Sequence, residues 1–213
     1  MHKFWSKTKF RNFLTLFKYD PEKYWQTRGK VFFNENPYDG PEWPAIENNF
    51  LKYILGLEFS SVLEFGCGFG RITNLMIKKF PFITEYRAVD LSKEQIKNAE
   101  KMINSDKVSF EVSTIQDLNV KKKFDLVLGF AVLMHVPPSD IKSVIDKLVS
   151  LSSRHVINAD WDDVKKPKLS LANFCFLHDY RSLFLNNPRV DSIKSFTLVE
   201  SPQHSSIFHA EVK

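Results

Sequence analysis

The sequence predicts an α/β fold: a doubly wound, seven-stranded sheet, mostly parallel with an antiparallel last strand, preceded by an N-terminal helical extension. Short apolar runs alternate with helical patterns through the middle of the chain, as in parallel sheets with helical crossovers. A glycine-rich turn follows the first of these runs. Two β-rich segments adjoin one another near the C-terminus, which a simple dinucleotide-binding domain would not predict.

The first 58 residues are predicted to form the helical extension or lid, and residues 59–213 the main domain. Pro21 after Asp20 is typical of a helix start, because proline fits the first helical turn. Three prolines and a glycine between residues 34 and 44 indicate a loop. The helices expected in this part cover residues 8–18, 21–30 and 45–57.

Strands and helices are expected to alternate through the middle of the chain. Ser92 and Gln95 match a capping box at the start of one of these helices. The expected strands cover residues 60–65, 85–90, 107–113, 124–130 and 155–160, with helices at 71–80, 92–104 and 138–151.

The last third of the chain departs from this alternation. Residues 161–171 are polar and lysine-rich, which indicates a loop beside the functional site, and residues 178–186 have a helical pattern. Two β-rich segments, 192–199 and 206–212, then follow with a short polar connection. Paired antiparallel, they would complete a seven-stranded sheet.

Composition indicates a compact intracellular protein, and we expect a cytoplasmic location. A chain of 213 residues with 43% hydrophobic content can bury one sizeable core. The two cysteines, Cys67 and Cys175, do not suggest a disulfide framework, since Cys67 lies within the glycine-rich turn. We find no signal-peptide pattern and no apolar run long enough for a transmembrane helix.

Positive charge concentrates at the N-terminus of a chain whose net charge is +5. The first 30 residues contain eight Lys or Arg against two acidic residues, and the remaining residues are nearly neutral. Aromatic residues interleave with these cations, which suits a weak contact with a membrane surface or with nucleic acid. We favour a helix docked on the domain with a solvated basic face. The sequence leaves the oligomeric state open.

The most informative feature is the glycine-rich turn that contains Gly66, Gly68 and Gly70. Its G-x-G-x-G spacing differs from the G-x-G-x-x-G of nicotinamide cofactor sites. Glu64 would repel a pyrophosphate but suits a ligand with an ammonium or sulfonium group. Asp90 ends the next apolar run and is placed to accept hydrogen bonds from a ribose diol. The turn therefore predicts a site for a ribose-bearing cofactor.

Four motifs in this order resemble the class I S-adenosylmethionine-dependent methyltransferases, of the small type 11/12 kind. They are Glu64–Gly70, Val89–Ser92, Phe124–Leu128 and Val132–Pro138. The resemblance covers residues 55–160 well and the C-terminal part more loosely. It implies a Rossmann-like fold with an antiparallel last strand, methyl-transfer activity, and S-adenosyl-L-methionine as the cofactor.

The resemblance also implies a set of cofactor-binding residues at the carboxyl ends of the strands, where parallel α/β sheets bind ligands. Asp90 would hold the ribose hydroxyls, Leu91 would pack on the adenine, and Arg28 would meet the cofactor carboxylate. Family members carry an acidic residue after the third strand, where this chain has Thr114, with Asp117 three residues later. No metal site is expected. The expected set is Trp25, Arg28, Glu64, Gly66, Gly68, Arg71, Asp90, Leu91, Thr114, Ile115 and Phe130.

Three polar residues are candidates for catalytic groups: His135, His178 and Asp160. Methyl transfer is an in-line displacement at a sulfonium carbon, so positioning supplies much of the rate. A general base helps only where the acceptor must lose a proton. Each candidate has a structural alternative: His135 could order the following proline turn, His178 could mark a helix N-terminus, and Asp160 could cap a loop.

The acceptor is expected to be a small molecule, with sugar or lipid-linked compounds as examples. Nucleic-acid amino-methyltransferases of this fold carry an Asn/Asp-Pro-Pro-aromatic tetrad after the fourth strand, where residues 129–132 are Gly-Phe-Ala-Val. That class is therefore disfavoured. Two alternatives stay open: an RNA or protein methyltransferase that uses the basic N-terminus, and a non-catalytic member that binds the cofactor or a partner.

Overall fold

The computed structural model describes residues 19–35, 40–161, 174–199 and 205–213. The expected helix over 8–18 and nearly all of the expected loop over 161–171 lie outside these residues. The elements in chain order are α2 Pro21–Glu35, α3 Trp43–Ile54, β1 Ser61–Phe65, α4 Arg71–Lys79, β2 Glu85–Asp90, α5 Lys93–Met102, β3 Val108–Val112, β4 Phe124–Phe130, η1 Leu133–His135, α6 Ile141–Leu151, β5 Ser152–Trp161, α7 Tyr180–Leu185, β6 Val190–Val199 and β7 Ser205–Val212.

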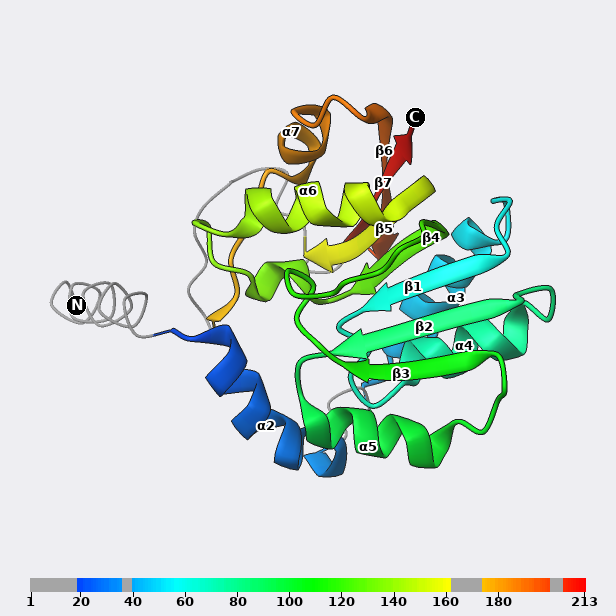
Figure 1. The fold of residues 1–213 in the computed structure, drawn as a ribbon, viewed down its shortest axis with the longest axis vertical. Helices are drawn as coiled ribbons and strands as arrows, with labels where there is room; N and C mark the ends of the chain where they lie inside the picture. Colours follow the sequence, from blue (N-terminus) through cyan, green and yellow to red (C-terminus); the bar gives the residue numbers. More distant parts are fainter. Residues whose placement is uncertain (1–18, 36–39, 162–173, 200–204) are drawn as a thin grey trace, which may run out of the picture.

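The seven strands form one sheet in the order β3-β2-β1-β4-β5-β7-β6. Strands β1 to β5 pair in parallel, whereas β7 is antiparallel to both of its neighbours, β5 and β6. The predicted doubly wound sheet with an antiparallel last strand is thus confirmed. Figure 1 shows the arrowheads of β1, β2 and β3 pointing to one edge, along which α2 lies.

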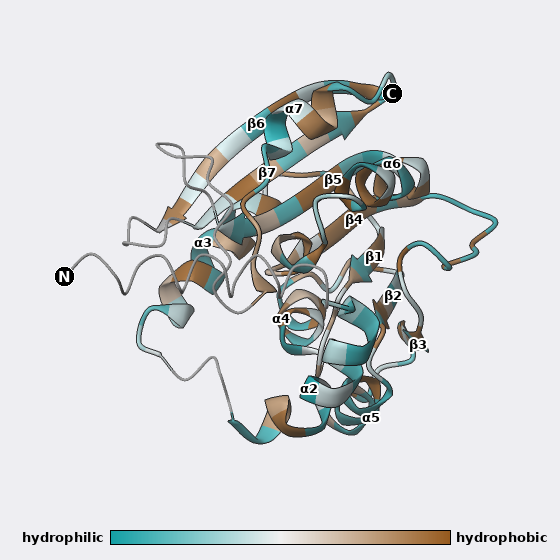
Figure 2. Ribbon diagram, turned by 90° about the vertical axis from the view of Figure 1, so that its left-hand side faces the viewer, coloured by the Kyte–Doolittle hydropathy of each residue, from teal (hydrophilic) through white to brown (hydrophobic). Residues whose placement is uncertain are grey.

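Helices cover both faces of the sheet. Successive residues of each strand point to opposite faces, so neighbouring residues belong to different cores. Val62 of β1 belongs to the core that includes residues of α3 and α4, and the next residue, Leu63, to the core that includes α6 and α7. Figure 2 shows hydrophobic colouring along β4 in the middle of the sheet. A strand covered on both sides is apolar along its buried part, which explains the apolar run Leu126–Leu128 within β4.

The two N-terminal helices differ in how deeply they are buried. Helix α3 places four apolar residues in the core at helical spacing: Ile46, Phe50, Leu51 and Ile54. Helix α2 buries only Gly29. A Cβ on Gly29 would lie 2.1 Å from Oγ of Ser92, so the absent side chain allows α2 to pack closely on the start of α5. The boundary between residues 58 and 59 stays a prediction.

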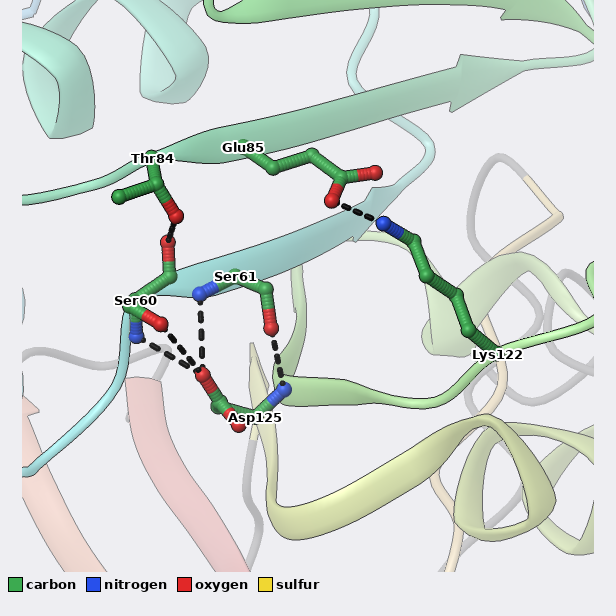
Figure 3. Close-up of polar contacts among 6 residues, drawn as sticks. All are labelled: Ser60, Ser61, Thr84, Glu85, Lys122 and Asp125. Carbon is green, nitrogen blue, oxygen red and sulfur yellow. Dashed lines mark hydrogen bonds and ion pairs between the residues drawn. The ribbon is translucent and has the colours of Figure 1, made fainter.

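At the amino ends of the strands, Asp125 ties β4 to β1 (Figure 3). Its Oδ2 accepts hydrogen bonds from the amides of Ser60 and Ser61, at 2.9 and 3.0 Å, and from the Ser60 hydroxyl at 3.0 Å. Burial acts to raise the pKa of Asp125, but these hydrogen bonds outweigh it and lower the pKa to about 2. The network lies at the amino ends of the strands, whereas the glycine-rich turn lies at their carboxyl ends. It ties the starts of β1 and β4 together.

Several element boundaries differ from expectation for local reasons. Helix α2 runs five residues beyond the expected end. Helix α6 begins at Ile141 instead of residue 138, because the short η1 helix and the pair Pro137-Pro138 come before it. Strand β5 begins at Ser152, so it follows α6 directly.

Candidate cofactor and acceptor site

One cavity of about 440 Å³ opens at the carboxyl ends of the parallel strands. The ends of β1, β2, β3 and β4 form its floor, and Trp25 and Phe32 of α2 line the opposite side. Eight residues of the expected cofactor set line this cavity: Trp25, Gly66, Gly68, Asp90, Leu91, Thr114, Ile115 and Phe130.

The glycine-rich turn adopts backbone angles that favour glycine. Gly66, Gly68 and Gly70 have φ values of 65°, 56° and 86°, in the left-handed region that a Cβ penalises. A Cβ on Gly66 would lie 2.5 Å from the Val132 side chain. A Cβ on Gly68 would meet no atom nearer than 3.7 Å. The backbone at Gly68 is therefore open to a ligand, whereas Gly66 is packed against the protein.

Asp90 connects the end of β2 to this turn. Its Oδ2 accepts from the Gly68 amide at 2.9 Å and its Oδ1 from the Ser92 amide at 2.8 Å. Burial raises the pKa of Asp90, although both hydrogen bonds act to lower it. Each carboxylate oxygen can accept further hydrogen bonds. The residue is thus fixed in place and can still accept from a ligand diol.

Gln95 and the loop after β3 complete this part of the cavity. Gln95 is 3% exposed, and its Oε1 has no hydrogen-bond partner among the described residues. A buried acceptor without a partner is costly, so it is well suited to a donor on a ligand. Thr114 donates to Asp117 at 2.6 Å, and both residues line the cavity. The loop therefore presents a carboxylate near the expected position after the third strand.

Glu64 does not line the main cavity. The residue is 2% exposed, and its carboxyl group accepts from the hydroxyls of Thr73 at 2.5 Å and Tyr86 at 2.7 Å. Burial raises the pKa of Glu64 to about 7, although the hydrogen bonds from Thr73 and Tyr86 act to lower it. It borders a smaller pocket beside the turn, together with Arg71. Its main contacts are thus on the α4 side of the sheet.

The two arginines expected at the cofactor site both form ion pairs within the protein. Arg28 pairs with Glu35 two helical turns along α2, and it does not line the cavity. Arg71 pairs with Glu47, and its guanidinium lies 5.0 Å from the ring centre of Phe130. Arg28 therefore lies outside the cavity lining, and its expected contact with the cofactor carboxylate stays a prediction.

His135 is the one predicted catalytic candidate that lines the cavity. Its Nδ1 donates to the Phe174 carbonyl at 3.1 Å, which leaves Nε2 as the acceptor nitrogen of a neutral ring. Burial lowers the pKa of His135 to about 4, so the ring is uncharged at neutral pH. The Trp25 ring packs edge-on against it, with 4.8 Å between the ring centres.

His178 and Asp160 lie behind the cavity wall. His178 donates through Nε2 to the Val136 carbonyl at 3.0 Å. Oδ2 of Asp160 accepts from the Met134 amide and the Tyr180 hydroxyl, both at 3.2 Å. Neither residue lines the cavity. Their observed contacts hold the η1 segment that carries His135.

Several cavity residues were not among the expected cofactor-binding or catalytic residues, and Gln95, Ala131 and Val132 are three of them. Gln95 was identified only as part of a helix cap. The Ser92 hydroxyl does accept a hydrogen bond from the backbone amide of Gln95 at 3.5 Å. Ala131 has φ of 58°, a strained angle for a residue with a Cβ. No single-sequence signal marks that angle. Val132 becomes significant only through its packing against Gly66.

Comparison with known proteins agrees with this geometry. Residues 62–154 match the family model described as a methyltransferase domain. A malonyl-(acyl-carrier protein) O-methyltransferase from Priestia megaterium is 39% identical over 71 residues, which are 33% of this chain and 26% of the relative. One from Acetivibrio thermocellus is 30% identical over 113 residues, 51% of this chain and 39% of the relative. The chain thus spans well under half the length of these relatives.

Solved structures extend the likeness to almost the whole chain. The N-methyltransferase NodS from Bradyrhizobium japonicum, bound to S-adenosyl-L-homocysteine, has a TM-score of 0.74 at 15% identity and covers 91% of this chain and 99% of its own. Magnesium protoporphyrin IX methyltransferase from Synechocystis, bound to S-adenosylmethionine, has a TM-score of 0.69 at 17% identity and covers 92% and 98%.

Residues 62–154 thus match a methyltransferase domain, and the chain has the fold of methyltransferases solved with S-adenosylmethionine or S-adenosyl-L-homocysteine bound. Among the described residues, no helix is both long and apolar enough to cross a membrane. The same residues contain no group of three or more His, Cys, Asp or Glu arranged to hold a metal ion.

Proposed function

We propose that the protein transfers the methyl group of S-adenosyl-L-methionine to a small-molecule acceptor. The observation that carries this proposal is the single cavity that joins the open backbone at Gly68, the fixed carboxylate of Asp90 and the partnerless buried oxygen of Gln95. A ribose-bearing ligand supplies the hydroxyl donors that these acceptors lack. We retain the expectation of a cytoplasmic enzyme.

The residues that would hold the cofactor follow from their places in the cavity. Asp90 would accept from the ribose hydroxyls, and Leu91 and Ile115 would pack on the adenine. Asp117 would accept from the adenine amino group. Gly68 would let the methionine portion lie against the backbone, beside Phe130. When bound, the cofactor supplies an activated methyl group on a positively charged sulfur.

His135 remains the candidate catalytic group, because its ring lines the cavity and its Nε2 is an acceptor. His178 and Asp160 would act as positioning residues through the η1 segment. Helix α2 would cover the bound cofactor, since Trp25 and Phe32 form one wall of the cavity.

A small-molecule acceptor is supported by the size of the cavity, about 440 Å³, and by the kinds of methyltransferase that match the chain. A sugar or lipid-linked acceptor is compatible with it. The names of the curated relatives also make a carrier-protein-bound acceptor a candidate. An RNA or protein acceptor would require the basic N-terminus, whose first 18 residues lie outside the described residues.

Calorimetric titration tests the cofactor. We expect S-adenosylmethionine to bind at one site and NAD not to bind. A folded sample that binds NAD, or that binds neither compound, would overturn the proposal. Screening of acceptors with a radiolabelled methyl donor then tests the reaction. Deletion of residues 1–18 tests the macromolecular alternative. Unchanged turnover of a small acceptor by the shortened protein would exclude a required role for that segment.

A further inference from the structure

The cavity has a second half, which is lined mainly by residues outside the expected cofactor set. The start of α2 lines it through Asp20 and Glu22, and the segment from η1 to α6 lines it through Pro137 and Asp140. These two segments are close together, because the Tyr19 hydroxyl donates to the His135 carbonyl at 3.0 Å. This half, together with Trp25 and His135, is the acceptor half of the cavity.

Every charged side chain among the described residues of the lining is acidic, although the whole chain carries a net charge of +5. The described residues that line the cavity include five carboxylates and no lysine or arginine: Asp20, Glu22, Asp90, Asp117 and Asp140. None of the five forms an ion pair with another described residue. No described residue therefore neutralises their charge through an ion pair, and their field in the cavity attracts cations and repels anions.

The remaining groups of the acceptor half are apolar or neutral. Trp25 and Pro137 provide an aromatic ring and an aliphatic wall. A tryptophan face attracts cations through its negative charge distribution. The His135 ring adds no positive charge at neutral pH, since burial lowers its pKa to about 4. An ammonium group on an apolar body would meet complementary groups here, whereas a carboxylate would meet none that is positively charged among the described residues.

We propose that the methyl acceptor is an amine that enters the cavity as a cation, which would make the protein an N-methyltransferase for small apolar amines. This inference rests on the proposed function and specifies its substrate class. It sets the chain apart from relatives named for a malonyl acceptor, because a free malonyl group ends in a carboxylate.

The chemical step balances without a further reagent. The bound ammonium first releases one proton to water, which frees the nitrogen lone pair. The nitrogen then forms a bond to the methyl carbon as the carbon–sulfur bond breaks, and the sulfur keeps the electron pair of that bond. Positive charge moves from sulfur to nitrogen, so the acidic lining stabilises the product as well as the entering amine.

Three probes of similar shape test the charge preference: 2-phenylethylamine, 2-phenylethanol and 3-phenylpropanoate. Their binding is measured by calorimetry on protein saturated with S-adenosyl-L-homocysteine, so that the cofactor half is filled. We expect the amine to bind at least tenfold more tightly than the carboxylate, with the alcohol between them. With S-adenosylmethionine, we expect mass spectrometry to detect the N-methylated amine. Equal or tighter binding of the carboxylate would overturn the inference.

Charge-altered variants locate the effect in the acceptor half. Asp140→Asn should reduce the preference for the amine several-fold, and Asp140→Lys should reverse it. Asp106→Asn serves as the matched control, because Asp106 is exposed on the turn before β3 at the opposite edge of the sheet. An amine preference that all three variants share would contradict the assignment to this cavity.

The first titration separates the two proposals. Normal binding of S-adenosyl-L-homocysteine without any amine preference would overturn the acceptor class alone. Absence of S-adenosyl-L-homocysteine binding in a folded sample would overturn the proposed function, and the inference with it.

Discussion

The backbone amide of Gly68 donates a 2.9 Å hydrogen bond to the carboxylate of Asp90, 22 residues further along the chain. This bond joins the glycine-rich turn after β1 to the end of β2. The second oxygen of Asp90 holds the Ser92 amide at the start of α5. The floor of the proposed cofactor site is thus organised without a ligand, which lowers the entropic cost of binding.

Alanine substitutions at two neighbouring glycines should have different effects. Both residues have positive φ, so each substitution adds about 1–2 kcal/mol of backbone strain. Gly66→Ala also places a Cβ 2.5 Å from Val132 and should destabilise the fold further. Gly68→Ala adds a methyl group on the cavity side and should chiefly weaken cofactor binding. Urea unfolding and calorimetry on both variants check this, and equal losses of stability would contradict it.

Gly29→Ala tests how α2 is held over the cavity. In an unpacked helix this change would stabilise by about 1 kcal/mol, because alanine is the better helix former. In this structure the new Cβ would lie 2.1 Å from Oγ of Ser92, so we expect α2 to move away from α5. S-adenosyl-L-homocysteine should then dissociate several-fold faster in stopped-flow measurements.

The matched control for this variant is Gly56→Ala, whose Cβ would meet no atom nearer than 3.7 Å. It should leave the dissociation rate unchanged. A Gly29→Ala protein that binds and releases the ligand like the native protein would show that the close contact with Ser92 does not hold α2.

Asp125→Asn should reduce stability without changing ligand binding. All three hydrogen bonds from Ser60 and Ser61 go to one oxygen, which asparagine can supply only without the negative charge, so we expect a loss of about 1–3 kcal/mol at pH 7. The folded-state pKa of about 2 lies below the ordinary value near 4. The stabilisation is therefore complete above about pH 4 and is lost as the pH falls toward 2.

Urea unfolding from pH 7 down to pH 3 measures this difference between the two proteins. It should shrink over the acidic end of the range. If the stability difference between the native protein and Asp125→Asn were the same at every pH, the charge of Asp125 would not be what stabilises the contact between β1 and β4.

His135→Asn separates the two roles of the histidine. The asparagine amide can still donate to the Phe174 carbonyl, but it has no group at the position of Nε2. If Nε2 orients the acceptor, turnover should fall about two- to tenfold, the effect of one neutral hydrogen bond. Binding of S-adenosyl-L-homocysteine should not change. Steady-state kinetics with an acceptor found by the probe experiment provides the test, and unchanged kcat and KM would remove His135 from the catalytic candidates.

The framework of the site could be predicted because it depends on local patterns. Gly66, Gly68 and Asp90 are marked by their spacing, and Ser92 by its position before a helical run. The positions that could not be predicted depend on the direction of a side chain in three dimensions. Glu64 faces the α4 side of the sheet because the next residue, Phe65, packs in the core on the other face. Nothing in β1 alone assigns those faces.

Arg28 illustrates a second reason why the prediction was incomplete. Its partner Glu35 lies seven residues later, on the same side of α2, and the helix runs five residues further than expected. An expected end at residue 30 leaves Glu35 outside the helix and Arg28 without an acidic neighbour. The ion pair therefore became evident only with the full extent of α2.

The most direct test of the central claim is a calorimetric titration of the native protein and of Asp90→Ala with S-adenosylmethionine. We predict binding at one site in the native protein, with an affinity at least tenfold weaker in Asp90→Ala and unchanged in Asp106→Asn. Absence of binding by the folded native protein, or equal affinity in all three proteins, would contradict the account.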